Sequence, residues 1–156
     1  MQSTCPSFFL RFIAPAFLLS AGLPSLHAEK LVDPVYKDNR GVAIRGYDPV
    51  AYFKEAKPVK GSAQFSHAWM GATWQFANDA NRALFAADPE KYAPRFGGYC
   101  AFAVSKNQTA EIDPEAWKII DGRLYLNYSK AVQKKWEDDV MTRIEAATKN
   151  WPALHK

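Results

Sequence analysis

Apolar and polar residues alternate in two parts of the chain, and each alternation predicts a β-hairpin. Residues 63–67 and 73–76 lie on either side of Met70-Gly71, which indicates two strands joined by a tight turn. Residues 117–128 read WKIIDGRLYLNY, with Asp121-Gly122 between two apolar runs. An Asp-Gly pair in that position favours a two-residue hairpin turn. We therefore expect two antiparallel hairpins.

Helix signals follow both hairpins. Asn78 or Asp79 can cap a short helix that ends at Asp88-Pro89, and we expect its Leu84 and Phe85 to face inward. Ser129 can cap a longer C-terminal helix. Apolar residues recur in this segment at helical spacing, at Val132, Trp136, Val140, Ile144 and Ala147. Two Asp-Pro pairs, at residues 48–49 and 88–89, predict further short helices or turns.

Gly97-Gly98 precedes an apolar run in which we expect Cys100 to lie at the start of a strand. No low-complexity segment and no repeat of about 20 to 50 residues is found in the sequence. The pattern as a whole predicts an α+β fold: a small antiparallel sheet of hairpins, short helices and one long C-terminal helix.

The first 28 residues have the plan of a secretory signal peptide, with one arginine, no acidic residue and an apolar run over residues 12–23. That run is shorter than the roughly 20 residues of a membrane-spanning helix. We expect cleavage after Ala28 and export to the periplasm or the extracellular space, without a membrane span. Residues 29–40 are expected to be loosely ordered, and residues 41–156 to form a single monomeric domain.

The charged residues argue against a nucleic-acid partner. The chain has 20 Lys and Arg against 16 Asp and Glu, and the basic residues are scattered among the acidic ones, whereas a nucleic-acid site needs a basic cluster. Sequence motifs of serine hydrolases, zinc proteases and P-loop enzymes are also absent. We therefore favour a non-enzymatic protein.

Cys100 is the only cysteine after the predicted signal peptide, so the exported chain can form no internal disulfide. Three roles are open: a buried and inert side chain, a reactive thiol, or a metal ligand. His67 is either an ordinary strand residue or a partner that lowers the thiol pKa of Cys100. As metal ligands, Cys100 and His67 would suit copper or zinc, in a weak, open or shared site.

Several motifs together resemble the YHS domain, a small module of heavy-metal-handling proteins. They are GYDPVAYF at residues 46–53, the spaced pattern F-x5-G-x2-W-x-F at residues 65–76, and DPEKYAP at residues 88–94. The continuation to the C-terminus is similar to exported stand-alone YHS proteins, some of which carry selenocysteine. The resemblance implies three metal-binding cysteines, but the matching positions are Ala51, Ala77 and Asn81.

Two functions follow as hypotheses. The first is an exported YHS-like module that binds a soft metal ion or a small ligand in a pocket near Tyr47, Asp48, His67 and Cys100. The alternative is a redox protein in which Cys100 reacts with the thiol of an external partner, because the chain supplies no second cysteine to complete the cycle.

Overall fold

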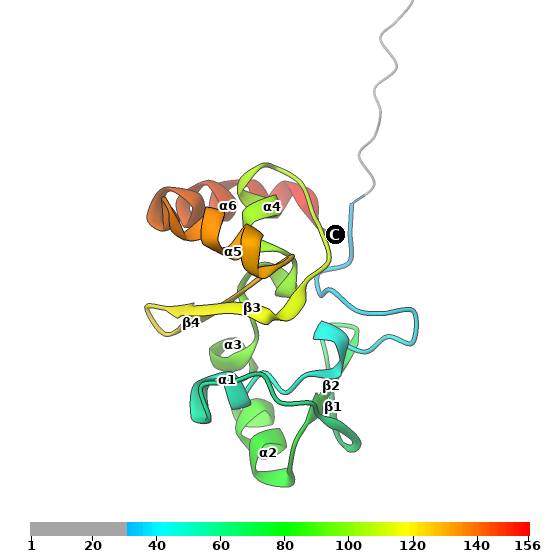
Figure 1. Ribbon diagram of the computed structural model, residues 1–156. Coiled ribbons are helices and arrows are strands. Elements are labelled where there is room, and N and C mark those ends of the chain that lie inside the picture. Colours follow the sequence, from blue (N-terminus) through cyan, green and yellow to red (C-terminus); the bar gives the residue numbers. More distant parts are fainter. Residues whose placement is uncertain (1–30) are drawn as a thin grey trace, which may run out of the picture.

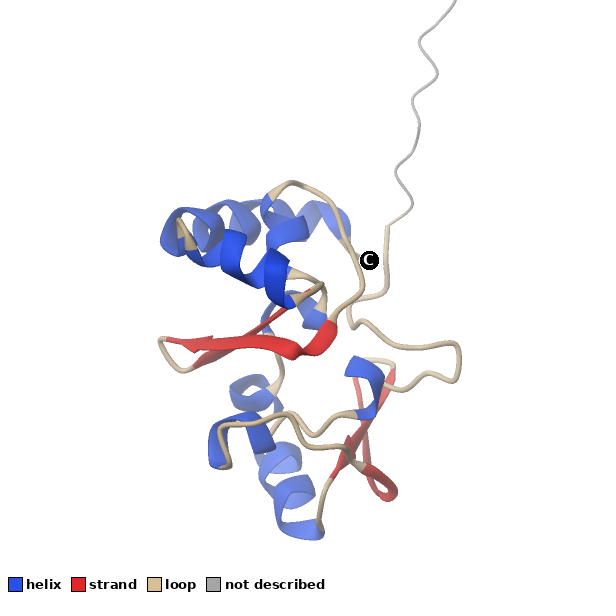
Figure 2. Ribbon diagram, in the orientation of Figure 1, coloured by secondary structure: helices blue, strands red, loops and turns tan. Residues whose placement is uncertain are grey.

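The computed structural model describes residues 31–156, so the predicted signal peptide lies outside the described residues. The predicted α+β class is confirmed: helices flank two separate antiparallel hairpins (Figures 1 and 2). The first half of the fold, residues 44–92, contains in order η1 (Ile44–Gly46), α1 (Ala51–Lys54), β1 (Ser62–Trp69), β2 (Ala72–Phe76), α2 (Asp79–Ala87) and α3 (Pro89–Tyr92). The second half, residues 95–154, contains η2 (Arg95–Gly98), α4 (Ala101–Ser105), β3 (Asp113–Ile120), β4 (Arg123–Asn127), α5 (Lys130–Glu137) and α6 (Val140–Leu154).

The two halves repeat one order of elements: a 3-10 turn, a short helix, a hairpin and two helices. The hairpins also share their register. In the first, Ser62 pairs with Phe76 and the ladder shifts before it resumes at Ser66. In the second, Asp113 pairs with Asn127 and the ladder shifts before Trp117. Each ladder therefore carries an irregularity at the same place, and the halves lie one above the other in Figure 1.

The helix caps and the core repeat as well. Asn78 caps α2 and Ser129 caps α5, and each side-chain oxygen accepts the N–H of the third residue along. Aromatic pairs hold the two helices on their hairpins. Rings of Trp74 and Phe85 are 5.1 Å apart at 34°, and a matching pair in the second half, Tyr125 and Trp136, is 5.3 Å apart at 38°.

The sequence shows no repeat of about 20 to 50 residues, yet the structure repeats one order of elements in two longer halves. The repeat resides in backbone features, namely turns, a shifted register and caps, and several residue types fulfil each of them. Side chains at equivalent positions differ, as Phe85 and Trp136 do, so the structural repeat is hard to see in the sequence. Short identities remain, among them Gly46-Tyr47 against Gly98-Tyr99.

Three local predictions need correction. Cys100 does not begin a strand: it makes one isolated bridge to Leu126 and then precedes helix α4. Leu84 on α2 is 37% exposed, and only Phe85 faces the core. The long C-terminal helix is confirmed as α6, but it does not start at Ser129: α5 comes first, and the chain leaves helical geometry at Asp139, where φ is −149° and ψ is 58°. The predicted cap at Ser129 is confirmed.

Residues 31–40 link the two halves. The N–H of Tyr36 donates to the carbonyl of Gly97 in the second half at 2.9 Å, and the carbonyl of Tyr36 accepts the N–H of Ile44 in the first half at 3.1 Å. Val35 is 1% exposed and belongs to the core. Gly97 allows this close approach, because a Cβ there would lie 2.0 Å from the carbonyl oxygen of Pro34. This segment thus closes the side of the molecule where the halves meet.

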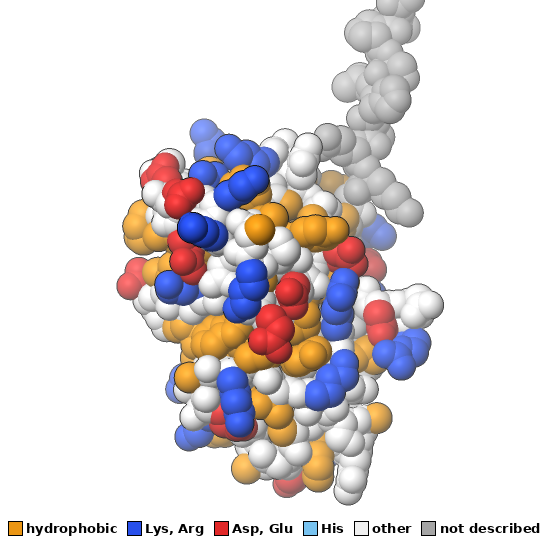
Figure 3. Space-filling view, in the orientation of Figure 1, with side chains coloured by type: hydrophobic (Ala, Val, Ile, Leu, Met, Phe, Trp, Pro, Cys, Tyr) orange, Lys and Arg blue, Asp and Glu red, His pale blue; other side chains and the backbone are white. Residues whose placement is uncertain are grey.

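The surface mixes charges of both signs. On the face shown in Figure 3, basic and acidic side chains alternate around a central apolar area. No helix within residues 31–156 has the length and apolar character needed to cross a membrane.

Candidate ligand-binding cleft

Asp48 is a buried carboxylate at the centre of the first half. It is fully buried, and its two oxygens accept four hydrogen bonds. Oδ1 accepts the N–H groups of Val50 at 2.8 Å and Ala51 at 3.3 Å, which begin helix α1. Oδ2 accepts the N–H of Ala77 at 2.9 Å and Nδ2 of Asn81 at 2.7 Å. The carboxylate therefore joins α1 to the end of β2 and to α2.

The three positions where the YHS resemblance places metal cysteines all contact this carboxylate. Ala51 and Ala77 donate through the backbone and Asn81 through its side chain. The fold thus brings together the three positions at which the resemblance implies thiolates, but none of the three residues is a cysteine. Within residues 31–156 no group of three His, Cys, Asp or Glu side chains is placed to hold a metal ion.

Cys100 occupies in the second half the place that Asp48 has in the first. Its sulfur accepts the N–H of Tyr128 at 3.3 Å, in the way that Asp48 accepts the N–H of Ala77 after the first hairpin. The thiol also lies 3.8 Å from Oδ1 of Asn127 and is 1% exposed. The thiol therefore acts as an internal hydrogen-bonding group that joins helix α4 to the end of β4.

The other predicted site residues lie elsewhere. His67 is half-buried on β1, with its ring 6.1 Å from that of Phe85. Tyr47 pairs through its backbone with Lys60, whose Nζ lies 4.7 Å from the tyrosine ring. No hydrogen bond or ring contact among residues 31–156 joins Cys100 to His67, or joins either residue to Asp48. A pocket shared by these four residues stays a prediction.

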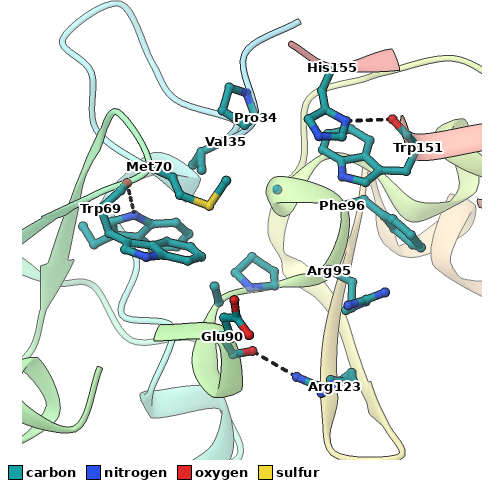
Figure 4. Close-up of a pocket in the computed structure, with 14 residues that line it drawn as sticks. Pro34, Val35, Trp69, Met70, Glu90, Arg95, Phe96, Arg123, Trp151 and His155 are labelled. Atoms are coloured by element: carbon teal, nitrogen blue, oxygen red, sulfur yellow. Dashed lines mark hydrogen bonds between the residues drawn. The ribbon is translucent and has the colours of Figure 1, made fainter. Parts of the chain in front are cut away.

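A different cavity lies where the two halves meet. It has a volume of about 300 Å³ and opens between the β1–β2 turn on one side and η2, β4 and the end of α6 on the other (Figure 4). Its lining combines aromatic, aliphatic and charged side chains: Pro34, Val35, Trp69, Met70, Trp74, Glu90, Ala93, Pro94, Arg95, Phe96, Gly97, Arg123, Trp151 and His155. We call this cavity the inter-half cleft.

Indole rings stand on both sides of the inter-half cleft. On the first side, Trp69 packs against Trp74 with ring centroids 5.9 Å apart, and its carbonyl accepts the indole N–H of Trp74 at 3.2 Å. On the opposite side, Trp151 stacks on His155 at 4.3 Å and 10°. A carbonyl oxygen only accepts, so His155 Nδ1, 2.7 Å from the carbonyl of Trp151, carries the hydrogen of that bond. Both aromatic walls are therefore held in place.

Met70 lies at the tip of the first hairpin and is 48% exposed (Figure 4). Its φ of 48° and that of Gly71, 71°, define a turn with two left-handed residues. Asn and Asp are preferred at the first position of such turns, and the equivalent residue of the second hairpin is Asp121, with φ of 49°. A methionine in this conformation costs stability without contributing to the core.

Two exposed arginines, Arg95 and Arg123, line the inter-half cleft and have no carboxylate partner within residues 31–156. Arg123 donates from Nη1 to the backbone carbonyl of Glu90 at 3.0 Å, and Arg95 lies above the ring of Phe96 at 5.7 Å. Neither forms an ion pair within residues 31–156, although Arg40, Arg45 and Arg82 all do. Glu90 is the only acidic residue of the lining. The charged side chains of the cleft therefore carry a net positive charge.

The sequence prediction missed these residues, because they come from five separate segments that only the tertiary fold unites. One signal was present: methionine at a hairpin position that favours Asn or Asp. Searches of family models, characterised proteins and solved structures found no match to the chain.

Proposed function

We propose that the protein is an exported, YHS-like binding module that holds one small ligand in the inter-half cleft. The observation that carries this proposal is the cleft itself, with a volume of about 300 Å³ and with Trp69 and Trp151 on opposite sides. Small-molecule sites are typically concave, mostly apolar and supplied with a few polar groups, and they often lie between structural units. The exposed Met70 beside Trp69 adds a flexible apolar side chain that adapts to a ligand.

Ala51, Ala77 and Asn81 all donate to Asp48, and this supports the YHS part of the proposal, because these are the three positions at which the resemblance implies cysteines. The same contacts favour a small ligand over a soft metal ion. Soft metals prefer several thiolate or imidazole ligands, and here an alanine, an alanine and an asparagine occupy those positions.

The burial of Cys100 favours binding over the redox alternative. A thiol that exchanges with a partner must be reached by another sulfur. Cys100 is 1% exposed and its sulfur is engaged by Tyr128 and Asn127. Reaction with an external thiol would require helix α4 to separate from the end of β4.

The test follows the tryptophan indole N–H signals by NMR while aromatic and aliphatic fragments are added to the purified protein. We expect saturable shifts at Trp69 and Trp151, with Trp117 and Trp136 unchanged because both lie outside the cleft. Trp69→Ala should abolish binding. Trp117→Ala is the matched control, because Trp117 is also a half-buried strand tryptophan. Equal binding by both variants, or no shift at the cleft with any fragment, would contradict the proposal.

A further inference from the structure

We infer that the ligand of the inter-half cleft is a small aromatic acid, a flat ring system that carries a carboxylate or a similar anionic group. This inference rests on the proposed function and adds the chemical class of the ligand. It is carried by two features that the cleft combines, a pair of aromatic walls and a pair of arginines without carboxylate partners.

The aromatic walls select a flat, unsaturated body. Trp69 and Trp151 line the cleft from opposite sides, and Met70 lies on the same side as Trp69 (Figure 4). Aromatic rings gain from offset stacking and edge-to-face contacts with indoles, in addition to the burial of their area. Thioether sulfur also makes favourable contacts with aromatic rings. A saturated ligand of the same size would lose these contacts and keep only its apolar burial.

The arginines select a negative charge. A guanidinium binds a carboxylate through two parallel N–H bonds, which adds orientation to the charge attraction. Arg95 has no carboxylate partner among residues 31–156, and Arg123 makes one bond, to the main-chain oxygen of Glu90. Both therefore keep N–H groups for a ligand. Glu90 sits at the same end of the cleft and would repel a second negative charge, which favours a monoanion.

The probe is 2-naphthoate, compared with two relatives. Its amide, 2-naphthamide, keeps the flat rings without the charge, and cyclohexanecarboxylate keeps the charge without the flat rings. Affinity is measured by calorimetry at low and moderate salt, and location by the indole N–H shifts of Trp69 and Trp151. We expect 2-naphthoate to bind about tenfold more tightly than either relative, and its affinity to fall as salt is raised.

Arg95→Gln tests the charge directly, because within residues 31–156 Arg95 donates to no backbone carbonyl, and glutamine keeps an N–H donor for the neighbouring Tyr125 side chain. We expect it to weaken 2-naphthoate about five- to tenfold and to leave 2-naphthamide unchanged, in keeping with a single exposed charge-assisted contact. Arg82→Gln is the matched control, since Arg82 is an arginine on α2 outside the cleft. It should alter neither affinity.

The outcomes separate the two proposals. If acid and amide bind equally well and both shift Trp69 and Trp151, the inference about charge is wrong and the cleft remains a binding site. If cyclohexanecarboxylate binds as well as 2-naphthoate, the inference about a flat ligand is wrong. If all three probes and the wider fragment set leave both indoles unchanged, the proposed function itself fails.

Discussion

Replacement of Asp48 by Asn tests whether this carboxylate is a structural element, as its contacts indicate, and not a ligand-binding group. In the variant, one oxygen can still accept from Val50 and Ala51. An NH2 group would take the place of Oδ2 and face two donors, the N–H of Ala77 and the amide of Asn81. The amide of Asn81 can turn its oxygen toward the new NH2 group, but the N–H of Ala77 cannot move.

The cost can be worked out from these contacts. One buried N–H without a partner costs about 1 to 3 kcal/mol, and hydrogen bonds to a charged group contribute more than those to a neutral one. We therefore expect Asp48→Asn to lower the free energy of unfolding by about 2 to 4 kcal/mol. A domain of this size has a total stability of roughly 5 to 15 kcal/mol. The melting temperature should fall by about 10 °C.

Urea unfolding followed by tryptophan fluorescence measures this loss, with Asp88→Asn as the matched control. Asp88 caps helix α3 by accepting the N–H of Lys91 at 3.2 Å, and it is exposed. Asn and Asp are about equal as N-caps, so the control should change stability by less than about 0.5 kcal/mol. A loss below about 1 kcal/mol for Asp48→Asn, or equal losses in both variants, would refute the structural role.

The remaining predictions concern Met70, Trp136, Cys100 and Tyr99. Met70→Asn should raise the free energy of unfolding by about 0.5 to 1 kcal/mol, because Asn tolerates a positive φ. The same variant should bind 2-naphthoate more weakly in calorimetry. Asp121→Met, the reverse change in the other hairpin, should lower the stability of the protein and leave 2-naphthoate binding unchanged. Trp136→Ala should cost about 3 to 5 kcal/mol in urea unfolding, because the side chain is fully buried; an unchanged midpoint would show that α5 does not dock. Cys100 should resist alkylation by iodoacetamide in the folded protein and react at once in urea, and rapid labelling without urea would contradict its burial. Burial raises the pKa of Tyr99 from 10.0 to about 12, so its contribution to stability is fully present below pH 10 and is lost as the pH rises toward 12. Tyr99→Phe should therefore lessen the loss of stability at alkaline pH, measured by melting curves over a range of pH. Identical curves for the variant and the parent would refute this.

Local sequence patterns determined the hairpins and most helix starts. Asp121-Gly122 permits the left-handed turn it was expected to form, and Ser129 caps the helix that follows. These features depend on a few neighbouring residues, so the sequence alone reveals them. The α+β class follows from their order.

The tertiary structure decided what the buried polar groups do. Nothing near Asp48 in sequence shows that its carboxylate will accept a bond from Asn81, and nothing near Cys100 shows that its sulfur will accept one from Tyr128. Both contacts form only when a helix closes on the far end of a hairpin. For that reason both residues resemble site residues in the sequence and are internal contacts in the fold.

The inter-half cleft depends on tertiary structure still more. Trp69 and Trp151 are far apart along the chain and line opposite sides of one cleft only because the two halves pack together. The repeat that produces this packing is held in turns, register and caps, where many residue types are equivalent, and it is therefore nearly invisible in the residues themselves. The sequence by itself specified each half, and the cleft arose from the contact between them.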